Sequence, residues 1–231
     1  MRKLVILVSL IFIIDLTTIC TVISAENKKT ENTKQGQESI KQEPIIHKEQ
    51  TSSKGDENTI TSNLVVIQTD KGTIKIKLFT KEAPITTNNF IDLVKKGFYN
   101  GTVFHRIVES FVIQGGDPLG DGTGNYIDSD TGKPSFIKLE TNPDLKFDRP
   151  GRVGMARTSA PDSASCQFFI ALQPLPSLNP GGVDPYGYAV FGQVTDDSFE
   201  TVKKIVKDFK PAFPGSDRPA SPIRMVSVTL Q

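Results

Sequence analysis

Few side chains in this 231-residue sequence could carry covalent or metal chemistry. The chain has two histidines, His47 and His105, and two cysteines, Cys20 and Cys166. Two distant cysteines cannot build a disulfide framework or a cysteine-rich zinc site, and two histidines argue against a histidine-ligated metal. No nucleophile-elbow motif supplies a serine that could work with His105 as in a serine hydrolase. We therefore expect no metal and no cofactor.

The remaining reactive-looking features have plain structural interpretations. Residues 115–124 are rich in glycine and aspartate, but they lack the lysine of a Walker loop and the spacing of an EF-hand. We interpret them as a flexible connection. His105 is expected to be a structural histidine with its hydrogen bonds satisfied, on the strand face opposite to Arg106. Cys166 is expected to be a small buried residue, which only exposure and a lowered pKa would turn into a redox group.

The elements that must position any site begin with a hairpin and a helix. Residues 64–69 are followed by a turn at 70–72 and by the alternating run 73–78, in which isoleucine and leucine share one face and lysine the other. Pro84 suits the first turn of a helix, and Gly97 can adopt the left-handed conformation that ends it. The pattern predicts a strand hairpin followed by one short amphipathic helix.

Short β-rich runs follow, separated by connections rich in glycine and proline. A second helix is predicted over 198–209, because apolar residues recur there at helical spacing. Such spacing of short strands favours a barrel or a sandwich in a single domain. The predicted later strands span residues 103–108, 111–114, 152–155, 167–172, 189–194 and 223–230.

The N-terminal part of the chain differs from the rest. Residues 1–25 carry Arg2 and Lys3 ahead of an apolar run, which predicts a signal peptide or a signal anchor and hence export, with membrane anchoring if it is retained. Residues 26–62 are rich in polar and charged residues without any period, which predicts a disordered linker. Residues 63–231 form the expected folded domain. The net charge of +1 provides no field for nucleic acid, so we expect no nucleic-acid partner.

Three segments of the predicted domain resemble the cyclophilin family. Residues 104–107 (FHRI) with 111–117 (FVIQGGD) are similar to its F-H-R-[IV]-x-x-x-F-x-x-Q-G-G-D signature. Residues 154–157 (GMAR) with 165–170 (SCQFFI), and residues 188–194 (YAVFGQV), are similar to two further segments in the family's order. The resemblance implies a mainly β protein, a closed eight-stranded antiparallel β-barrel capped by two α-helices. It also implies peptidyl-prolyl cis/trans isomerase activity on proline-containing polypeptides.

The resemblance also implies roles for individual residues. Arg106 would be the catalytic hydrogen-bond donor, because an arginine stays charged and presents several fixed donors. Gln114 would help to orient Arg106 and the substrate backbone. The residues implied in substrate binding are Phe111, Val112, Ala156, Arg157, Gln167, Phe169, Leu178 and Tyr188.

Several positions depart from the family's pattern. Val112 stands where many relatives carry methionine, Arg157 where the best-known eukaryotic members have asparagine, and Tyr188 where they have histidine. Ser177 occupies a position that is usually aromatic, and this puts affinity for cyclosporin in doubt more than catalysis. A catalytically weak proline-binding chaperone module is the alternative function. We expect a monomer outside the cytoplasm, in the periplasm or another extracytoplasmic location, that assists protein folding.

Overall fold

The structure is a computed structural model that describes residues 63–231 of the chain. The predicted leader (1–25) and linker (26–62) lie outside the described residues, so both stay predictions. Within the described part, no helix combines the length and apolar character needed to cross a membrane.

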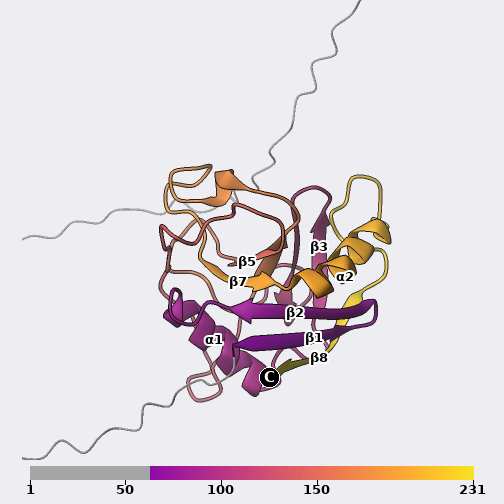
Figure 1. The fold of residues 1–231 in the computed structure, drawn as a ribbon. Coiled ribbons are helices and arrows are strands. Elements are labelled where there is room, and N and C mark those ends of the chain that lie inside the picture. The colour runs from indigo at the N-terminus through magenta and orange to yellow at the C-terminus, as the bar shows by residue number, and fades with distance from the viewer. Residues whose placement is uncertain (1–62) are drawn as a thin grey trace, which may run out of the picture. The chain divides into compact units, whose positions relative to one another are not determined.

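Eight antiparallel strands close into a barrel in the order β1-β2-β7-β5-β6-β4-β3-β8, with β8 pairing back onto β1. Figure 1 shows β1, β2 and β8 side by side at the front of this barrel. The predicted eight-stranded barrel is thereby confirmed. The strands are β1 (Leu64–Thr69), β2 (Gly72–Leu78), β3 (Val103–Val108), β4 (Val112–Asp117), β5 (Arg152–Met155), β6 (Phe168–Ala171), β7 (Val190–Val194) and β8 (Ile223–Leu230).

The first helix, α1 (Pro84–Lys95), begins and ends as its sequence predicts. Gly97 has a φ of 66°, and the Phe98 amide donates to the Leu93 carbonyl at 3.0 Å, which is the hydrogen bonding of a glycine-terminated helix. At the other end, the Glu140 carboxylate accepts hydrogen bonds from the amides of Ile85 and Thr86. A residue far along the chain therefore supplies the cap that Ala83 cannot provide.

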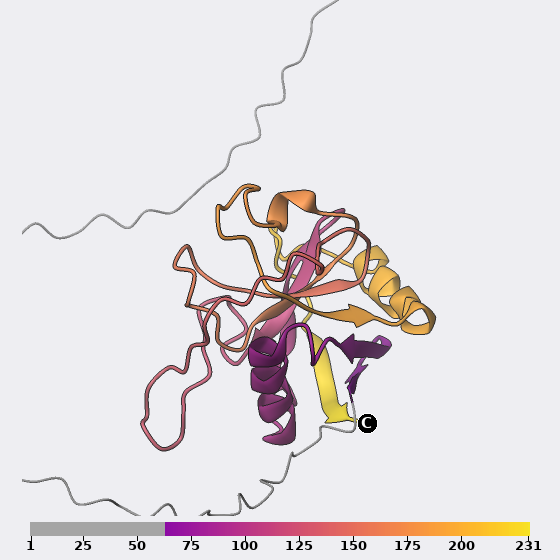
Figure 2. The same ribbon diagram turned by 60° about the vertical axis from the view of Figure 1, so that its left-hand side comes forward.

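The second helix, α2 (Asp196–Lys207), starts two residues before the predicted position and ends before Phe209. Asp196 and Asp197 lie in its first turn, where negative charge is favourable next to the free amides of a helix start. The two views of Figures 1 and 2 place α1 and α2 on different sides of the barrel. A short 3₁₀ helix, η1 (Pro176–Leu178), lies in the connection before β7.

Two apolar clusters lie on opposite faces of the barrel wall. Phe168 of β6 points inward, where its ring contacts those of Phe90 and Tyr99 at centroid distances of 5.4 and 5.8 Å. The next residue, Phe169, points outward and stacks on Phe147 at 5.4 Å. This alternation is the one expected for a strand, and it creates an apolar floor outside the barrel as well as a core inside it.

Strand β4 is longer than predicted, and it corrects the interpretation of residues 115–124 as a flexible connection. Gly115 and Gly116 belong to β4, and a Cβ on Gly115 would lie 2.9 Å from the Val103 carbonyl oxygen, so glycine allows this close approach of β3. The Asp117 carboxylate then accepts hydrogen bonds from the amides of Leu119, Asp121 and Gly122. The loop after β4 is thus folded around a buried aspartate.

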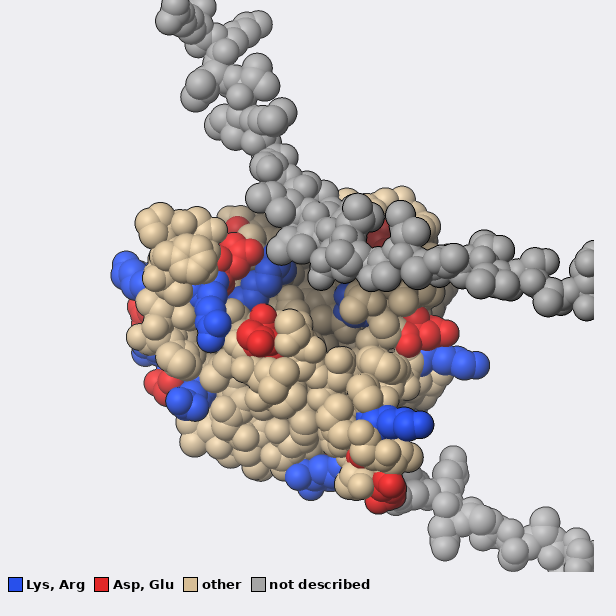
Figure 3. All heavy atoms as spheres, turned by 180° about the vertical axis from the view of Figure 1, so that it is seen from behind, with Lys and Arg blue, Asp and Glu red and all other residues tan. Residues whose placement is uncertain are grey.

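The face of the molecule opposite to that of Figure 1 carries charges of both signs. Lysine and arginine side chains lie among aspartates and glutamates there, without a broad area of one sign (Figure 3). On this face, local ion pairs therefore matter more than a long-range electrostatic field.

Candidate active site

A β-bulge in β3 decides which way Arg106 points. Phe104 pairs with Gly115 and Arg106 pairs with Gln114, so His105 is an extra residue without a partner in the ladder. Phe104 and Ile107 both lie in the barrel core, although strict alternation would put residues three apart on opposite faces. The extra residue therefore reverses the alternation and brings Arg106 to the outer face of the barrel.

Cross-strand pairing lines up the outer face beside Arg106. Arg106 of β3 is opposite Gln114 of β4, Gln114 is opposite Phe169 of β6, and Phe169 is opposite Gly154 of β5. A Cβ on Gly154 would overlap the rings of both Phe169 and Phe147, so the glycine makes room for this stacked aromatic pair. One row across four strands thus holds a cation, an amide and an apolar floor.

A cavity of about 220 Å³ lies over this row. Gln167 lines an adjoining polar pocket of about 190 Å³ instead, together with Gln114, Ala156 and Arg157. The structure therefore brings nine of the ten predicted site residues around one cavity and places the tenth next to it. The nine are Arg106, Phe111, Val112, Gln114, Ala156, Arg157, Phe169, Leu178 and Tyr188.

The apolar side of the cavity is built by two loops and a strand. Phe169 provides the floor, and the ring of Tyr188 meets it edge-on at 5.8 Å. The Tyr188 amide donates to the Leu178 carbonyl at 3.0 Å, which ties the segment before β7 to η1. This backbone hydrogen bond therefore fixes the positions of Leu178 and Tyr188, the two walls of the slot, relative to each other.

Hydrogen bonding fixes the direction of the Gln114 amide. The Gln167 Nε2 donates to the carbonyls of Gly122 and Gly124, at 3.0 and 2.8 Å, and a carbonyl can only accept. The Gln167 Oε1 must therefore face Gln114, whose Nε2 donates to it at 3.0 Å. Gln114 is left with its Oε1 as an acceptor that has no hydrogen bond to any described residue, and no hydrogen bond joins it to Arg106.

Arg106 keeps most of its donors available. Its Nε lies 3.2 Å from the Asp217 Oδ2, and its side chain is 40% exposed. Neither Nη group makes a hydrogen bond with another residue in the described range 63–231. The guanidinium is therefore anchored at one nitrogen and presents two others at the cavity.

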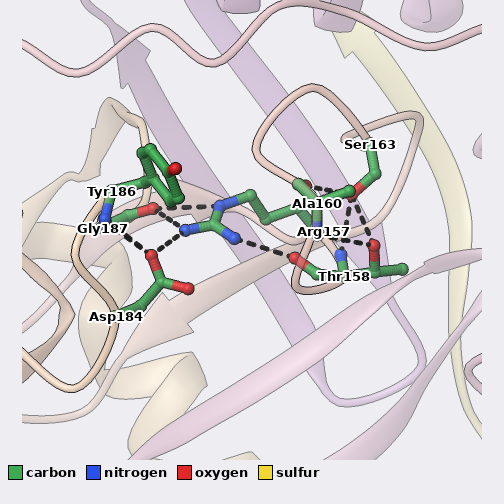
Figure 4. A network of polar contacts seen from close by, with 7 residues as sticks. All are labelled: Arg157, Thr158, Ala160, Ser163, Asp184, Tyr186 and Gly187. Carbon is green, nitrogen blue, oxygen red and sulfur yellow. Dashed lines mark hydrogen bonds and ion pairs between the residues drawn. The ribbon is translucent and has the colours of Figure 1, made fainter.

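Arg157 lines the cavity as predicted, but its guanidinium is directed at the protein itself. Its side chain is only 1% exposed, and its guanidinium donates to the Gly187 and Thr158 carbonyls and to the Asp184 carboxylate (Figure 4). Its charged end also lies 4.7 Å from the centre of the Tyr188 ring. Each of its three nitrogens therefore donates to the protein, which holds the segment before β7, and the almost fully buried guanidinium offers little to a substrate backbone.

The Arg157–Asp184 pair also affects the pKa of the carboxyl group. The hydrogen bond from Arg157 is the main cause that holds the pKa of Asp184 below its ordinary value. Asp184 in turn accepts hydrogen bonds from the amides of Tyr186 and Gly187. One aspartate thus joins the buried arginine to the turn that precedes Tyr188.

The prediction for His105 is half right. The side chain is buried, but neither ring nitrogen has a hydrogen-bond partner among residues 63–231, so the expectation of a satisfied histidine is wrong. The physical reason is its place in the bulge, where the ring packs near Gly122 instead of meeting a polar neighbour. Burial lowers the pKa of His105, which favours the neutral ring. Cys166 is buried as predicted, and burial raises the pKa of its thiol to about 11.

Two residues at the site carried no recognisable sequence pattern. Asp217, which anchors Arg106, lies 111 positions later in the chain, in the loop before β8. Phe147, which stacks under Phe169, lies in an irregular segment without strand or helix periodicity. Both reach the site through tertiary contacts, so neither spacing nor periodicity could indicate them.

Comparison with known proteins gives the same fold. The family model described as cyclophilin type peptidyl-prolyl cis-trans isomerase matches residues 64–230. A solved cyclophilin type peptidyl-prolyl cis-trans isomerase of Cryptosporidium parvum, crystallised in the presence of the dipeptide Ala-Pro, aligns with a TM-score of 0.64 and 32% identity. The alignment covers 73% of this chain and 98% of that one.

Sequence relatives come from bacteria and from eukaryotes. A peptidyl-prolyl cis-trans isomerase of Acinetobacter baylyi is 38% identical over 75% of this chain and 88% of its own. Peptidylprolyl isomerase cyp7 of Schizosaccharomyces pombe and a spliceosome-associated protein CWC27 homolog of Danio rerio are each 38% identical over 74% of this chain. This chain spans about a third of the length of those two eukaryotic relatives (34% and 33%). With its barrel, its signature segments and these matches, the chain belongs to the cyclophilin-type peptidyl-prolyl cis-trans isomerase family.

Proposed function

We propose that this chain is an active peptidyl-prolyl cis/trans isomerase whose site is the cavity beside Arg106. The observation that carries the proposal is the composition of that cavity. It combines an apolar slot over Phe169, an arginine with unused donors, and an amide acceptor on Gln114. A proline ring needs the slot, and the amide bond before it needs the donor and the acceptor.

The reaction breaks no covalent bond, but its activation barrier is high. Rotation about an X-Pro amide meets a barrier of roughly 18–20 kcal/mol, which arises from resonance of the C–N bond, and it breaks no covalent bond. In the twisted state the resonance is lost, and the prolyl nitrogen becomes pyramidal with a lone pair that can accept a hydrogen bond. A donor that meets the nitrogen only in this state lowers the barrier without tightening ground-state binding.

The residues divide this task in a definite way. Arg106 donates to the prolyl nitrogen through the nitrogens that Asp217 leaves unused. The Gln114 Oε1 accepts a hydrogen bond from a backbone amide of the substrate, because the chain through Gln167 turns that oxygen away from the protein's own donors. Phe111, Val112 and Leu178 enclose the pyrrolidine ring over Phe169. Arg157 contributes by positioning Tyr188 and not by contacting the substrate backbone.

We further propose that the protein acts outside the cytoplasm and assists protein folding there. The support for this role is the sequence of residues 1–25, with its basic start and apolar run. The relatives' names point to different settings, since the Danio rerio protein is named as spliceosome-associated and the Acinetobacter baylyi protein carries no such association. Family membership therefore leaves the clients open, and the leader is the feature that favours exported polypeptides.

An exchange experiment tests the activity itself. Cis/trans exchange of one Ala-Pro peptide is followed by NMR with the wild-type protein and with Phe111→Ala, which removes a wall of the slot. Uncatalysed exchange takes tens of seconds, and the wild-type protein should make it much faster. Phe111→Ala should weaken both binding and turnover. Binding of the peptide without acceleration by the wild-type protein would favour the proline-binding module instead.

A further inference from the structure

The anchoring of Arg106 depends on a carboxylate that lies outside the signature segments. The Asp217 Oδ2 accepts a hydrogen bond from the Arg106 Nε at 3.2 Å, and the two side chains are 50% and 40% exposed. An arginine side chain has several rotatable bonds, and at this exposure packing alone does not fix it. The carboxylate is the only described group that forms an ion pair or a hydrogen bond with this guanidinium.

The loop that carries Asp217 is built to hold it at this place. The Asp217 carbonyl accepts a hydrogen bond from the Ile107 amide at 2.7 Å, which attaches the loop to β3 one residue after Arg106. Within the loop, Ala212 donates to the Arg218 carbonyl at 2.8 Å, and Pro211 and Pro219 form an isolated β-bridge. Backbone hydrogen bonds therefore fix the position of Asp217 independently of its side chain. The loop in this way places the carboxylate next to Arg106.

The choice of nitrogen matters for catalysis. A carboxylate on Nε orients the plane of the guanidinium and leaves both Nη groups for a ligand, whereas a carboxylate on both Nη groups would use the donors that the reaction needs. Small errors in the position of a catalytic group cost rate, by as much as about 100-fold for a displacement of about 1 Å. Asp217 therefore has the geometry of a residue that prepares Arg106 and does not compete with the substrate.

We infer that Asp217 is a positioning residue of the isomerase reaction, which holds the Arg106 guanidinium in the orientation that meets the twisted amide. This inference rests on the proposed function and adds to it a residue outside the family's signature segments. Asp217 acts through Arg106 and has no contact of its own with the reacting amide. Its removal should therefore affect turnover more than binding of the peptide.

The test uses Asp217→Ala and Asp217→Asn in the full chain. Exchange of an Ala-Pro peptide in the bound state should slow by about tenfold in Asp217→Ala, while the peptide's Kd changes less than about twofold. Asp217→Asn keeps an acceptor for Nε without the charge, so its loss should be smaller, about threefold. The matched control is Asp197→Ala, which removes a similarly exposed carboxylate that pairs with Lys75 at 2.8 Å. The control should keep the wild-type exchange rate.

Coupling to Arg106 separates positioning from a general effect on the loop. In an Arg106→Ala background, adding Asp217→Ala should change the residual exchange rate by less than about 1.5-fold, because the group that Asp217 orients is gone. A tenfold loss in both backgrounds would overturn the inference, and so would a wild-type rate in Asp217→Ala when Arg106→Ala alone is impaired. If Arg106→Ala itself exchanged the peptide normally, the proposed catalytic role of Arg106 would fail, and this inference with it.

Discussion

At the scale of single residues, His105 determines the site without being part of the chemistry. Its insertion as a bulge turns Arg106 from the barrel interior to the outer face, opposite Gln114. Without the extra residue, alternation from the buried Phe104 would direct a guanidinium into a core of aromatic rings, where an unpaired charge is very costly. The buried histidine, whose ring nitrogens have no hydrogen-bond partner among residues 63–231, is therefore the cost of placing an arginine on the correct face.

Cys166 gives a prediction at the same scale. Burial raises the pKa of its thiol from 9.0 to about 11, so the thiolate fraction at pH 8 falls roughly 100-fold. In a Cys20→Ser variant, iodoacetamide should therefore modify the native protein about 100-fold more slowly than the urea-unfolded protein. The unfolded thiol ionises first, so this group's contribution to stability is complete below about pH 9 and declines as the pH rises towards 11. Equal labelling rates in the two states would show that Cys166 is accessible and ionised.

At the scale of elements, the segment before β7 is held by a buried arginine and its partly exposed aspartate partner. Arg157 reaches from the end of β5 to the Asp184 carboxylate and the Gly187 carbonyl (Figure 4). Its guanidinium also lies over the ring of Tyr188. Removing Arg157 leaves the buried Gly187 carbonyl without a donor among the described residues, whereas the partly exposed Asp184 carboxylate can be hydrated. The position of the Tyr188 wall therefore depends on Arg157.

Arg157→Ala should lower the free energy of unfolding by about 1–3 kcal/mol, measured by urea denaturation, because the buried Gly187 carbonyl loses its donors. It should also weaken binding of an Ala-Pro peptide, because Tyr188 loses the group that holds it. Arg149→Ala is the matched control, since Arg149 pairs with Asp148 but its side chain is 62% exposed. That variant should behave like the wild type. A similar decrease in the free energy of unfolding in both variants would mean that the buried contacts of Arg157 are not what stabilises the segment.

The same scale shows what the sequence could predict. Alternation, β-rich runs between glycine- and proline-rich connections, and helical spacing predicted the eight strands and both α-helices of the described residues. They failed where tertiary contacts decide. The Glu140 cap on α1, the Asp217 anchor on Arg106 and the buried pairing of Arg157 each join residues far apart in the sequence, so no local pattern contains them.

The resemblance to a family predicted which residues form the site, and the structure shows how they are arranged. Nine predicted residues surround one cavity, yet their signature cannot say that every nitrogen of Arg157 already donates to the protein, or that the Gln114 Oε1 has no partner among residues 63–231. The bulge at His105 had a readable trace, since the core residues Phe104 and Ile107 are three apart in a strand. A period of two excludes that spacing unless one residue is inserted.

At the scale of the whole molecule, the barrel separates stability from function. The inner apolar cluster fills the barrel, while the outer cluster around Phe147, Phe169 and Leu178 forms the floor of the cavity. The described residues 63–231 thus supply both a core and a cavity floor. The folded part should therefore carry the activity by itself.

A shortened chain that begins at Thr61 tests this expectation. It should unfold at the same temperature as the full-length protein and should keep its full rate on a short Ala-Pro peptide, because it keeps every member of the two apolar clusters within the described residues. Circular dichroism melting and the NMR exchange assay provide the two measurements. A clear loss of melting temperature or rate would show that the removed residues contribute to the folded domain.

The most direct measurement of the central claim compares binding with turnover in Arg106→Ala. Exchange spectroscopy on one Ala-Pro peptide gives the isomerisation rate in the bound state, and a titration of the same sample gives the Kd. If Arg106 acts only on the twisted amide, the rate should fall by roughly 100-fold to 1,000-fold, equivalent to about 3–4 kcal/mol of barrier, while the Kd changes much less. Arg106→Lys should recover only part of the rate, because an ammonium keeps the charge but lacks the fixed fork of donors. An unchanged exchange rate in Arg106→Ala would contradict the account.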